Sequence, residues 1–317
     1  MVKKIFSLAI RVALVGVCLV FLLWELDMEQ MMATFRTFDP WRMAMMELVV
    51  LATLLVPTLR LMFLTRHRIK FPLSMQAVVL CLGLNNIFPA KLGELAKVSF
   101  LRQKADIPMS HGLGIVFWER FFDLNAVLLF GVITAYLLDK SLLLVPLTMV
   151  VGIFWVFLVL NNYFPNISRL LLRLIPLPIL KNFVAAILDH LQERFEWKFL
   201  WVLGWYTLLA WMAYSVMVFI FLLWIAGLNL TVAQVAAVFV MSSIGVSLPS
   251  SPGGLGVYEA AIVLSLGWFG VAKETALVVG LAMHLLQMLP VIIGSLAILF
   301  ATKLDRNELL RIKPRQS

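Results

Sequence analysis

PSSPGGLGVYE, residues 249–259, interrupts an apolar stretch of this chain, and PAKLGE, residues 89–94, interrupts an earlier one. In each, a Gly stands four places after a Pro and a carboxylate follows soon after. We call residues 89–94 the first break and residues 249–259 the second break. Paired interruptions of apolar segments in the two halves of a chain indicate the substrate site of a transporter. The sequence therefore predicts a transport site at the two breaks.

The composition is typical of an integral membrane protein. The 317 residues are 62% hydrophobic and 14% charged, with a mean hydropathy of +0.99, far from the values of a soluble domain. A membrane-spanning helix needs about 20 apolar residues. The two apolar segments that end at the breaks are shorter than this, which makes them candidates for re-entrant hairpins. Six stretches are long enough: 5–24, 41–64, 113–138, 142–160, 199–226 and 276–301.

The net charge of +9 could indicate a nucleic-acid partner, but the placement of the basic residues favours membrane topology. Lys and Arg gather in short cytoplasmic loops of membrane proteins, where they also attract anionic lipids. The loops of this chain alternate in that way, with both termini on the cytoplasmic side. The side assigned to the cytoplasm carries Lys3, Lys4, Arg66, Arg68, Lys70, Lys91, Lys97, Arg102, Lys104, Arg169, Arg173, Lys181, Arg194, Lys198, Lys303, Arg306, Arg311, Lys313 and Arg315.

This topology predicts an inverted repeat within one membrane domain, residues 1–317. The half-repeats are 1–140 and 141–302, and each reads as span, span, re-entrant hairpin, span. The second half begins on the opposite side of the membrane from the first. Irregular backbone at membrane depth needs protein or a watery cavity around it. We therefore expect the two hairpin tips to face each other near the membrane midplane.

Two segments are expected to lie outside the membrane. Residues of about 177–197 have the periodicity of an amphipathic helix, which either lies on the cytoplasmic surface or only links the two halves. Residues 303–317 form a basic tail.

The third predicted span contains the densest group of charges, Glu119-Arg120-Phe121-Phe122-Asp123. Glu119 and Asp123 share a helix face, and Arg120 is placed to pair with Asp123. The group could be an internal salt bridge that only neutralises buried charge. Charged residues in a span are costly and more often functional. Two acids beside one Arg leave a carboxylate for a proton, a cation or a second basic partner.

The breaks themselves offer sites for an anion. A helix that restarts after Pro89 would direct its N-terminal N–H groups into the bundle, and Lys91 adds a full charge. Glu94 equally fits a structural place in the first helical turn. In the second break, Gly253, Gly254 and Gly256 allow either a backbone nest for an anion or close helix packing.

Other polar residues of the spans carry weaker signals. Asn86 precedes the first break, and His284 shares a helix face with Gln287. Such groups more often join helices than bind ligands, although His284 could relay protons. The sequence has no metal-ligand spacing, disulfide framework or nucleotide-binding motif, and no cofactor is expected.

The ordered set of short motifs resembles the lysylphosphatidylglycerol synthase transmembrane region family, also called flippase-like domain proteins. The motifs are Asn86 to Pro89, Gly93-Glu94, Glu119-Arg120-x-x-Asp123 and Pro252 to Glu259. The resemblance implies a multi-pass protein of the bacterial or archaeal membrane, with relatives that translocate aminoacylated phosphatidylglycerol or act on polyprenyl-linked and other glycolipids. Members that synthesise the aminoacyl lipid carry a large soluble domain. The sequence ends at Ser317, so synthesis is not expected.

The leading hypothesis is a flippase for an anionic, aminoacylated or glycosylated lipid in the cytoplasmic membrane, with no catalytic residues and no nucleic-acid partner. The alternatives are an integral membrane enzyme of lipid or glycolipid modification and a partner subunit of such an enzyme. The predicted substrate site comprises Asn86, Lys91, Gly93, Glu94, Glu119, Arg120, Asp123, Gly253, Gly254, Gly256, Tyr258 and Glu259.

Overall fold

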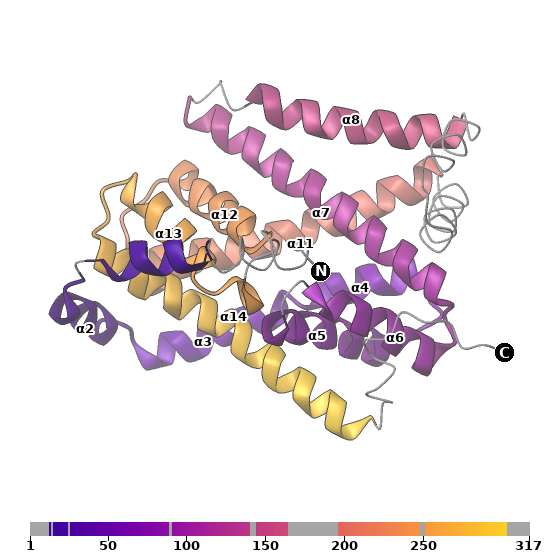
Figure 1. Ribbon diagram of the computed structural model, residues 1–317, viewed down its shortest axis with the longest axis horizontal. Coiled ribbons are helices and arrows are strands. Elements are labelled where there is room, and N and C mark those ends of the chain that lie inside the picture. The colour runs from indigo at the N-terminus through magenta and orange to yellow at the C-terminus, as the bar shows by residue number, and fades with distance from the viewer. Residues whose placement is uncertain are drawn as a thin grey trace.

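The computed structural model describes residues 13, 15–24, 26–88, 91–139, 144–163, 196–247 and 251–302, and this part of the chain is helical without a strand (Figure 1). A helix at residues 15–23 comes first. The others are α2 (Met28–Arg36), α3 (Pro40–Ala52), α4 (Leu55–Leu64), α5 (Phe71–Ile87), α6 (Gly93–Ala105), α7 (Met109–Leu137), α8 (Leu144–Tyr163), α11 (Trp197–Ile220), η3 (Phe221–Ile225), α12 (Val232–Ser247), η4 (Pro252–Gly254), α13 (Val257–Gly267) and α14 (Lys273–Ala301).

Four continuous helical stretches in the described residues are long and apolar enough to cross a membrane. They are Pro40–Leu64, Met109–Leu137, Trp197–Ile225 and Lys273–Ala301. These stretches confirm the location of four of the six predicted spans, and α7 and α14 begin a few residues earlier than predicted. The predicted span at 142–160 coincides with α8 from Leu144 on, and parts of this span and of the one at 5–24 lie outside the described residues. The protein is thus an all-α, multi-pass membrane protein.

Two shorter apolar helices, α5 and α12, each precede a break and are followed by a second short helix. Helix α5 ends where Phe88 adopts an extended conformation, as the residue before a proline favours. The second break contains three glycines with positive φ, at 64° for Gly253, 77° for Gly254 and 83° for Gly256. Glycine adopts this conformation without steric cost. The Pro and Gly residues of the two breaks therefore end and restart the helices, as the sequence predicts.

The helices of the two halves pack in a similar order, both within each half and across the molecule. Helix α5 packs on α6 and α6 on α7, while α12 packs on α13 and α13 on α14. Across the molecule, the long helix α14 lies along α5, and α12 lies along α7 (Figure 1). One apolar core joins α4 to α7 with the start of α11, and another joins the first helix, α3 and the end of α11 with η3 and α12 to α14. The first break connects two helices of the former core, and Tyr258 of the second break belongs to the latter.

Two sequence predictions concern segments beyond the described residues. The amphipathic helix at about 177–197 lies outside them except for its last two residues, and the basic tail at 303–317 lies wholly outside.

Candidate functional site

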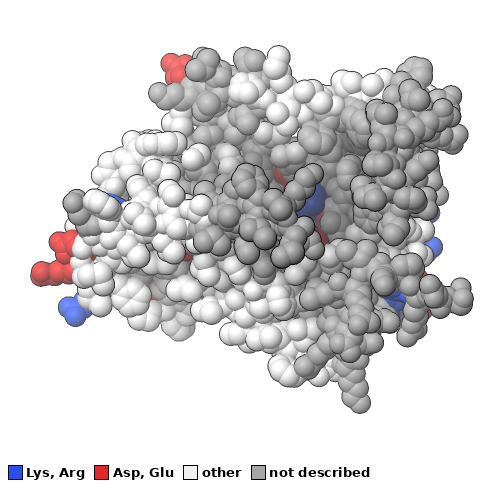
Figure 2. Space-filling view, viewed as in Figure 1, with Lys and Arg blue, Asp and Glu red and all other residues white. Residues whose placement is uncertain are grey.

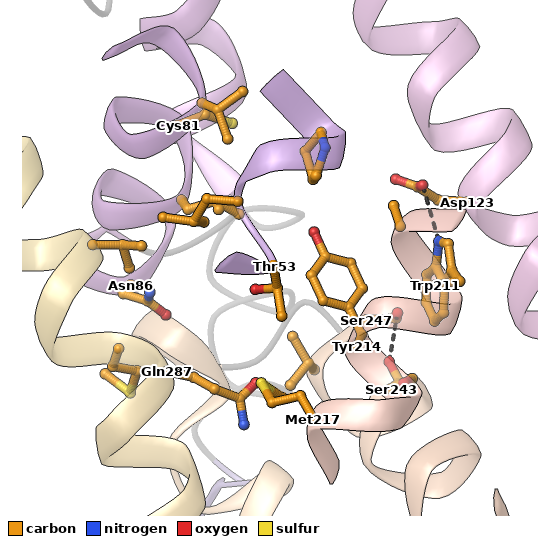
Figure 3. A pocket seen from close by; sticks show the side chains of 18 of the residues that line it. Thr53, Cys81, Asn86, Asp123, Trp211, Tyr214, Met217, Ser243, Ser247 and Gln287 are labelled. Carbon is orange, nitrogen blue, oxygen red and sulfur yellow. Dashed lines mark hydrogen bonds between the residues drawn. The ribbon is translucent and has the colours of Figure 1, made fainter. Parts of the chain in front are cut away.

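A cavity of about 320 Å³ lies between the two cores, next to both breaks. Its walls come from α3 to α7 on one side and from α11 to α14 on the other. Side chains of α5, α7, α11, α12 and α14 point into it (Figure 3), among them Asn86, Asp123, Tyr214, Ser243 and Gln287. In the space-filling view, basic and acidic side chains lie deep in a hollow near the middle of a largely uncharged face (Figure 2). Charged side chains thus line the interior of the cavity.

A buried ion pair between Lys97 and Glu119 stands at the centre of the charged network. The side chain of Lys97 is 3% exposed and that of Glu119 is 4% exposed. The Nζ atom of Lys97 also lies 3.3 Å from Oε2 of Glu94, one helical turn away on α6. Because an unpaired charge at this depth would cost several kcal/mol, each of these groups depends on its partners.

This finding corrects one sequence interpretation. Charge placement predicts that Lys97 lies on the basic cytoplasmic side, but the structure buries it in α6, paired with an acid of α7. Its position three residues after Glu94 was the available signal, because residues at that spacing share a helix face.

Asp123 is held by two arginines from different helices. Arg60 of α4 places Nη1 2.6 Å from Oδ1 of Asp123 and also donates to the hydroxyl of Thr207 at 3.2 Å. Arg120 approaches the other carboxylate oxygen at 3.2 Å, which confirms the predicted pairing of these neighbours on α7. The indole N–H of Trp211 donates to Oδ1 at 3.1 Å (Figure 3).

The second basic partner left open by the sequence is therefore present for both acids of α7. Lys97 pairs with Glu119, and Arg60 pairs with Asp123. Arg60 was missed as a site residue, although an arginine in an apolar span signals an intramembrane acid.

Two cations remain open to the cavity. The side chain of Arg120 is 45% exposed although Nε lies 3.4 Å from Glu94 and Nη2 lies near Asp123. Lys91 is partly buried in a left-handed conformation, with φ of 55°, and lines the cavity. Among the described residues, none of the ion pairs includes Lys91.

The network carries an excess of positive charge. It contains the cations Arg60, Lys91, Lys97 and Arg120 and the acids Glu94, Glu119 and Asp123. This excess and the accessible positions of Lys91 and Arg120 suit an anion of the size of a phosphate group.

Gly93 and Asn85 hold the two helices of the first break together. The amide side chain of Asn85 accepts a hydrogen bond of 2.9 Å from the N–H of Gly93. A Cβ atom on Gly93 would overlap the backbone carbonyl oxygen of Cys81. Gly93 therefore serves close packing of α5 on α6 and lies behind the cavity wall.

At the second break, backbone groups are used internally. The N–H of Gly254 donates to the carbonyl of Ser251 at 3.1 Å, and the N–H of Gly256 donates to the carboxylate of Glu259 at 2.7 Å. The predicted anion nest is thus partly occupied by the chain's own acceptors. Glu259 also contacts His284, whose Nδ1 lies 2.6 Å from Oε1.

The sequence of this chain matches a known protein family. Residues 8–294 match the family model of the lysylphosphatidylglycerol synthase TM region. The chain belongs to this family. A UPF0104 membrane protein of Methanocaldococcus jannaschii is 31% identical to it over 197 residues, which cover 58% of this chain and 78% of that protein. The family resemblance predicted from the short motifs is confirmed.

In this member of the lysylphosphatidylglycerol synthase TM-region family, the predicted site residues divide into two groups. Some line the cavity: Asn86, Lys91, Glu119, Arg120, Asp123, Gly253 and Tyr258. The others lie next to it and hold the breaks or the ion pairs: Gly93, Glu94, Gly254, Gly256 and Glu259. Within the described residues, no group of three or more His, Cys, Asp or Glu side chains is arranged to hold a metal ion.

Proposed function

We propose that the protein is a flippase that moves a lipid with an anionic headgroup across the cytoplasmic membrane. The observation that carries the proposal is the intramembrane cavity between two helix breaks, where Lys91 has no acidic partner among the described residues and Arg120 stays half-exposed. Such a cavity would shield the headgroup while the acyl chains remain in lipid. Membership of a family named for lysylphosphatidylglycerol synthesis supports a lipid substrate.

The packing of the helices supports alternating access by an inverted repeat. The span Pro40–Leu64 and the helices α5, α6 and α7 of one half correspond in order and relative length to the span Trp197–Ile225 and the helices α12, α13 and α14 of the other. The contact of α14 with α5 then has its counterpart in the contact of α7 with α12. In transporters built from inverted repeats, rocking of one repeat against the other opens a central site to each side in turn. We propose that the two breaks act as re-entrant hairpins in this way, with both termini cytoplasmic.

The charges of the cavity favour a glycosylated headgroup over an aminoacylated one. Both carboxylates that line the cavity among the described residues, Glu119 and Asp123, are held in ion pairs. A cationic aminoacyl group would therefore meet no free acid. The remaining wall offers Ser243, Ser247 and Gln287, neutral groups that accept or donate hydrogen bonds to hydroxyls.

The test is selective translocation by the purified protein in proteoliposomes. We expect fluorescent phosphatidylglycerol and an anionic glycolipid to lose their label to an impermeant quencher faster than in empty vesicles. Labelled phosphatidylcholine, which has no net charge, and lysylphosphatidylglycerol should move more slowly. Equal rates for all headgroups would contradict an anion site, and chemical conversion of a lipid would favour the integral membrane enzyme. Absence of both translocation and conversion would favour a partner subunit of a separate lipid-modifying enzyme.

A further inference from the structure

A buried histidine at the second break stands between two hydrogen-bond acceptors. His284 of α14 is 4% exposed. Its Nδ1 atom lies 2.6 Å from the carboxylate of Glu259, and its Nε2 atom lies 3.1 Å from the backbone carbonyl oxygen of Gly253. Both partner atoms are hydrogen-bond acceptors as long as Glu259 is ionised, so the ring itself must then supply both hydrogens. The number of protons on this trio therefore decides whether both contacts hold.

Proton counting gives two states that satisfy the geometry. A neutral imidazole has one N–H, whereas an imidazolium has two. With Glu259 ionised, only the imidazolium donates to both Glu259 and Gly253. Loss of the proton on Nε2 leaves a lone pair facing the carbonyl oxygen of Gly253, and that contact becomes repulsive. A neutral pair, in which protonated Glu259 donates to Nδ1, contains the same total number of protons.

The surroundings favour the ionised form of the pair. Glu259 accepts a 2.7 Å hydrogen bond from the N–H of Gly256 and lies in the first turn of α13, where the helix dipole stabilises a negative charge. The ring of Tyr258 lies 4.3 Å from the His284 ring, between centroids, and an aromatic face attracts a cation at this separation.

The titratable and polar groups of the elements packed around the histidine are few. Glu259 is the acidic group in contact with His284 among the described residues. The others are Tyr258 on α13, Gln287 on α14 itself, Asn86 on α5, Cys18 close to Gly256 and, on the wall of the same cavity, Lys91 and Arg120.

The carbonyl that His284 holds belongs to the tip that contacts the first half. Gly253 has φ of 64°, and a Cβ atom there would meet the amide oxygen of Asn86 at 3.0 Å. The short helix η4 that contains Gly253 packs on α5, and both Gly253 and His284 line the cavity. Release of this carbonyl would loosen the contact between the two breaks at the place where the cavity must open.

We infer that His284, Glu259 and the Gly253 carbonyl form a proton-binding site that couples proton movement to lipid transport. The inference rests on the proposed flippase function. One proton bound on the pair keeps the second break docked against α5. Its departure from Nε2 to solvent through the cavity undocks the tip, so that each cycle carries one proton with the lipid.

The proton site is tested first without transport. The chain has four histidines, at positions 67, 111, 190 and 284. Nitrogen NMR of histidine-labelled protein therefore identifies the His284 signals as those that remain when His67, His111 and His190 are each replaced by Gln. We expect the His284 ring to carry two protons at low pH and one at high pH. Glu259→Gln should move this transition to lower pH, because it removes the charge that stabilises the imidazolium. A constant protonation state while the protein stays folded, or a transition unmoved by Glu259→Gln, would overturn the inference.

Coupling is tested in proteoliposomes with a pH difference of about one unit across the membrane. If one proton moves with each lipid, this difference corresponds to an approximately tenfold shift in the steady-state distribution of the anionic lipid between the two leaflets. We expect this shift with wild type and with His67→Gln, whose histidine is exposed. His284→Gln, which has no proton to exchange at this site, should lose this shift. If wild type translocates without any shift, coupling is wrong and the flippase stands. If wild type moves no lipid, the flippase falls and the NMR result alone judges the proton site.

Discussion

The two halves of the molecule build the same acid–base pair with different bases. In the first half, Glu94 near the start of α6 contacts Arg120 of α7; in the second, Glu259 near the start of α13 contacts His284 of α14. Both long helices have 29 residues, and Arg120 and His284 stand at the same position counted from Met109 and Lys273.

The difference lies in exposure and in permanence of charge. Arg120 is 45% exposed and stays charged at any physiological pH, whereas the side chain of His284 is 6% exposed and can release its proton. On the two proposals made above, one half supplies a fixed charge that binds the headgroup and the other a charge that a proton switches.

The largest expected effect is a difference in the free energy of unfolding lost when a buried base of each half is removed. Lys97→Ala should lower the free energy of unfolding by about 3–5 kcal/mol, because it leaves Glu119 buried without its cation. His284→Ala should cost about 1–3 kcal/mol, since Glu259 keeps its hydrogen bond from Gly256. Thermal unfolding in detergent measures both. Equal losses would show that the second half depends on its pair as strongly as the first.

The next effect compares the glycines of the two breaks. Gly93→Ala should cost about 1–3 kcal/mol, because the added methyl group overlaps the carbonyl of Cys81 and α5 must move away from α6. Gly254→Ala meets no atom closer than 3.6 Å, so its cost of about 1–2 kcal/mol comes from the left-handed backbone alone. Crosslinking of cysteines introduced on α5 and α6 should weaken in Gly93→Ala only. Weakening in both variants would contradict the packing role assigned to Gly93.

Exchange of the base between the halves sharpens the comparison further. Arg120→His should make binding of the anionic lipid depend on pH, because an imidazole carries its positive charge at low pH and loses it as the pH rises, whereas a guanidinium stays charged. Arg120→Lys should bind with the same affinity across this range. Binding of labelled phosphatidylglycerol to each detergent-solubilised variant, relative to wild type, checks the expectation. A pH-independent Arg120→His would mean that Arg120 does not hold the headgroup.

Much of the fold follows from the sequence because hydropathy and helix breakers act locally. Four spans, both breaks and the pairing of Arg120 with Asp123 were predicted from segment length, Pro and Gly positions and helical spacing. Contacts between distant helices were not. Arg60 and Lys97 reach Asp123 and Glu119 only after α4, α6 and α7 pack together, and His284 meets Glu259 only when α13 lies on α14. Charge placement alone cannot tell a loop lysine from a buried one, and for that reason Lys97 was misassigned.

The central claim is that Lys91 and Arg120 hold an anionic headgroup between the breaks. Translocation of labelled phosphatidylglycerol by Lys91→Ala, at matched amounts of folded protein, tests it most directly. Because Lys91 makes no ion pair in the described part of the chain, the free energy of unfolding of Lys91→Ala should differ from that of wild type by less than about 0.5 kcal/mol. The matched control is Lys70→Ala, which removes an exposed lysine just before α5. We predict loss of translocation in Lys91→Ala and wild-type rates in Lys70→Ala; a wild-type rate in Lys91→Ala would contradict the claim.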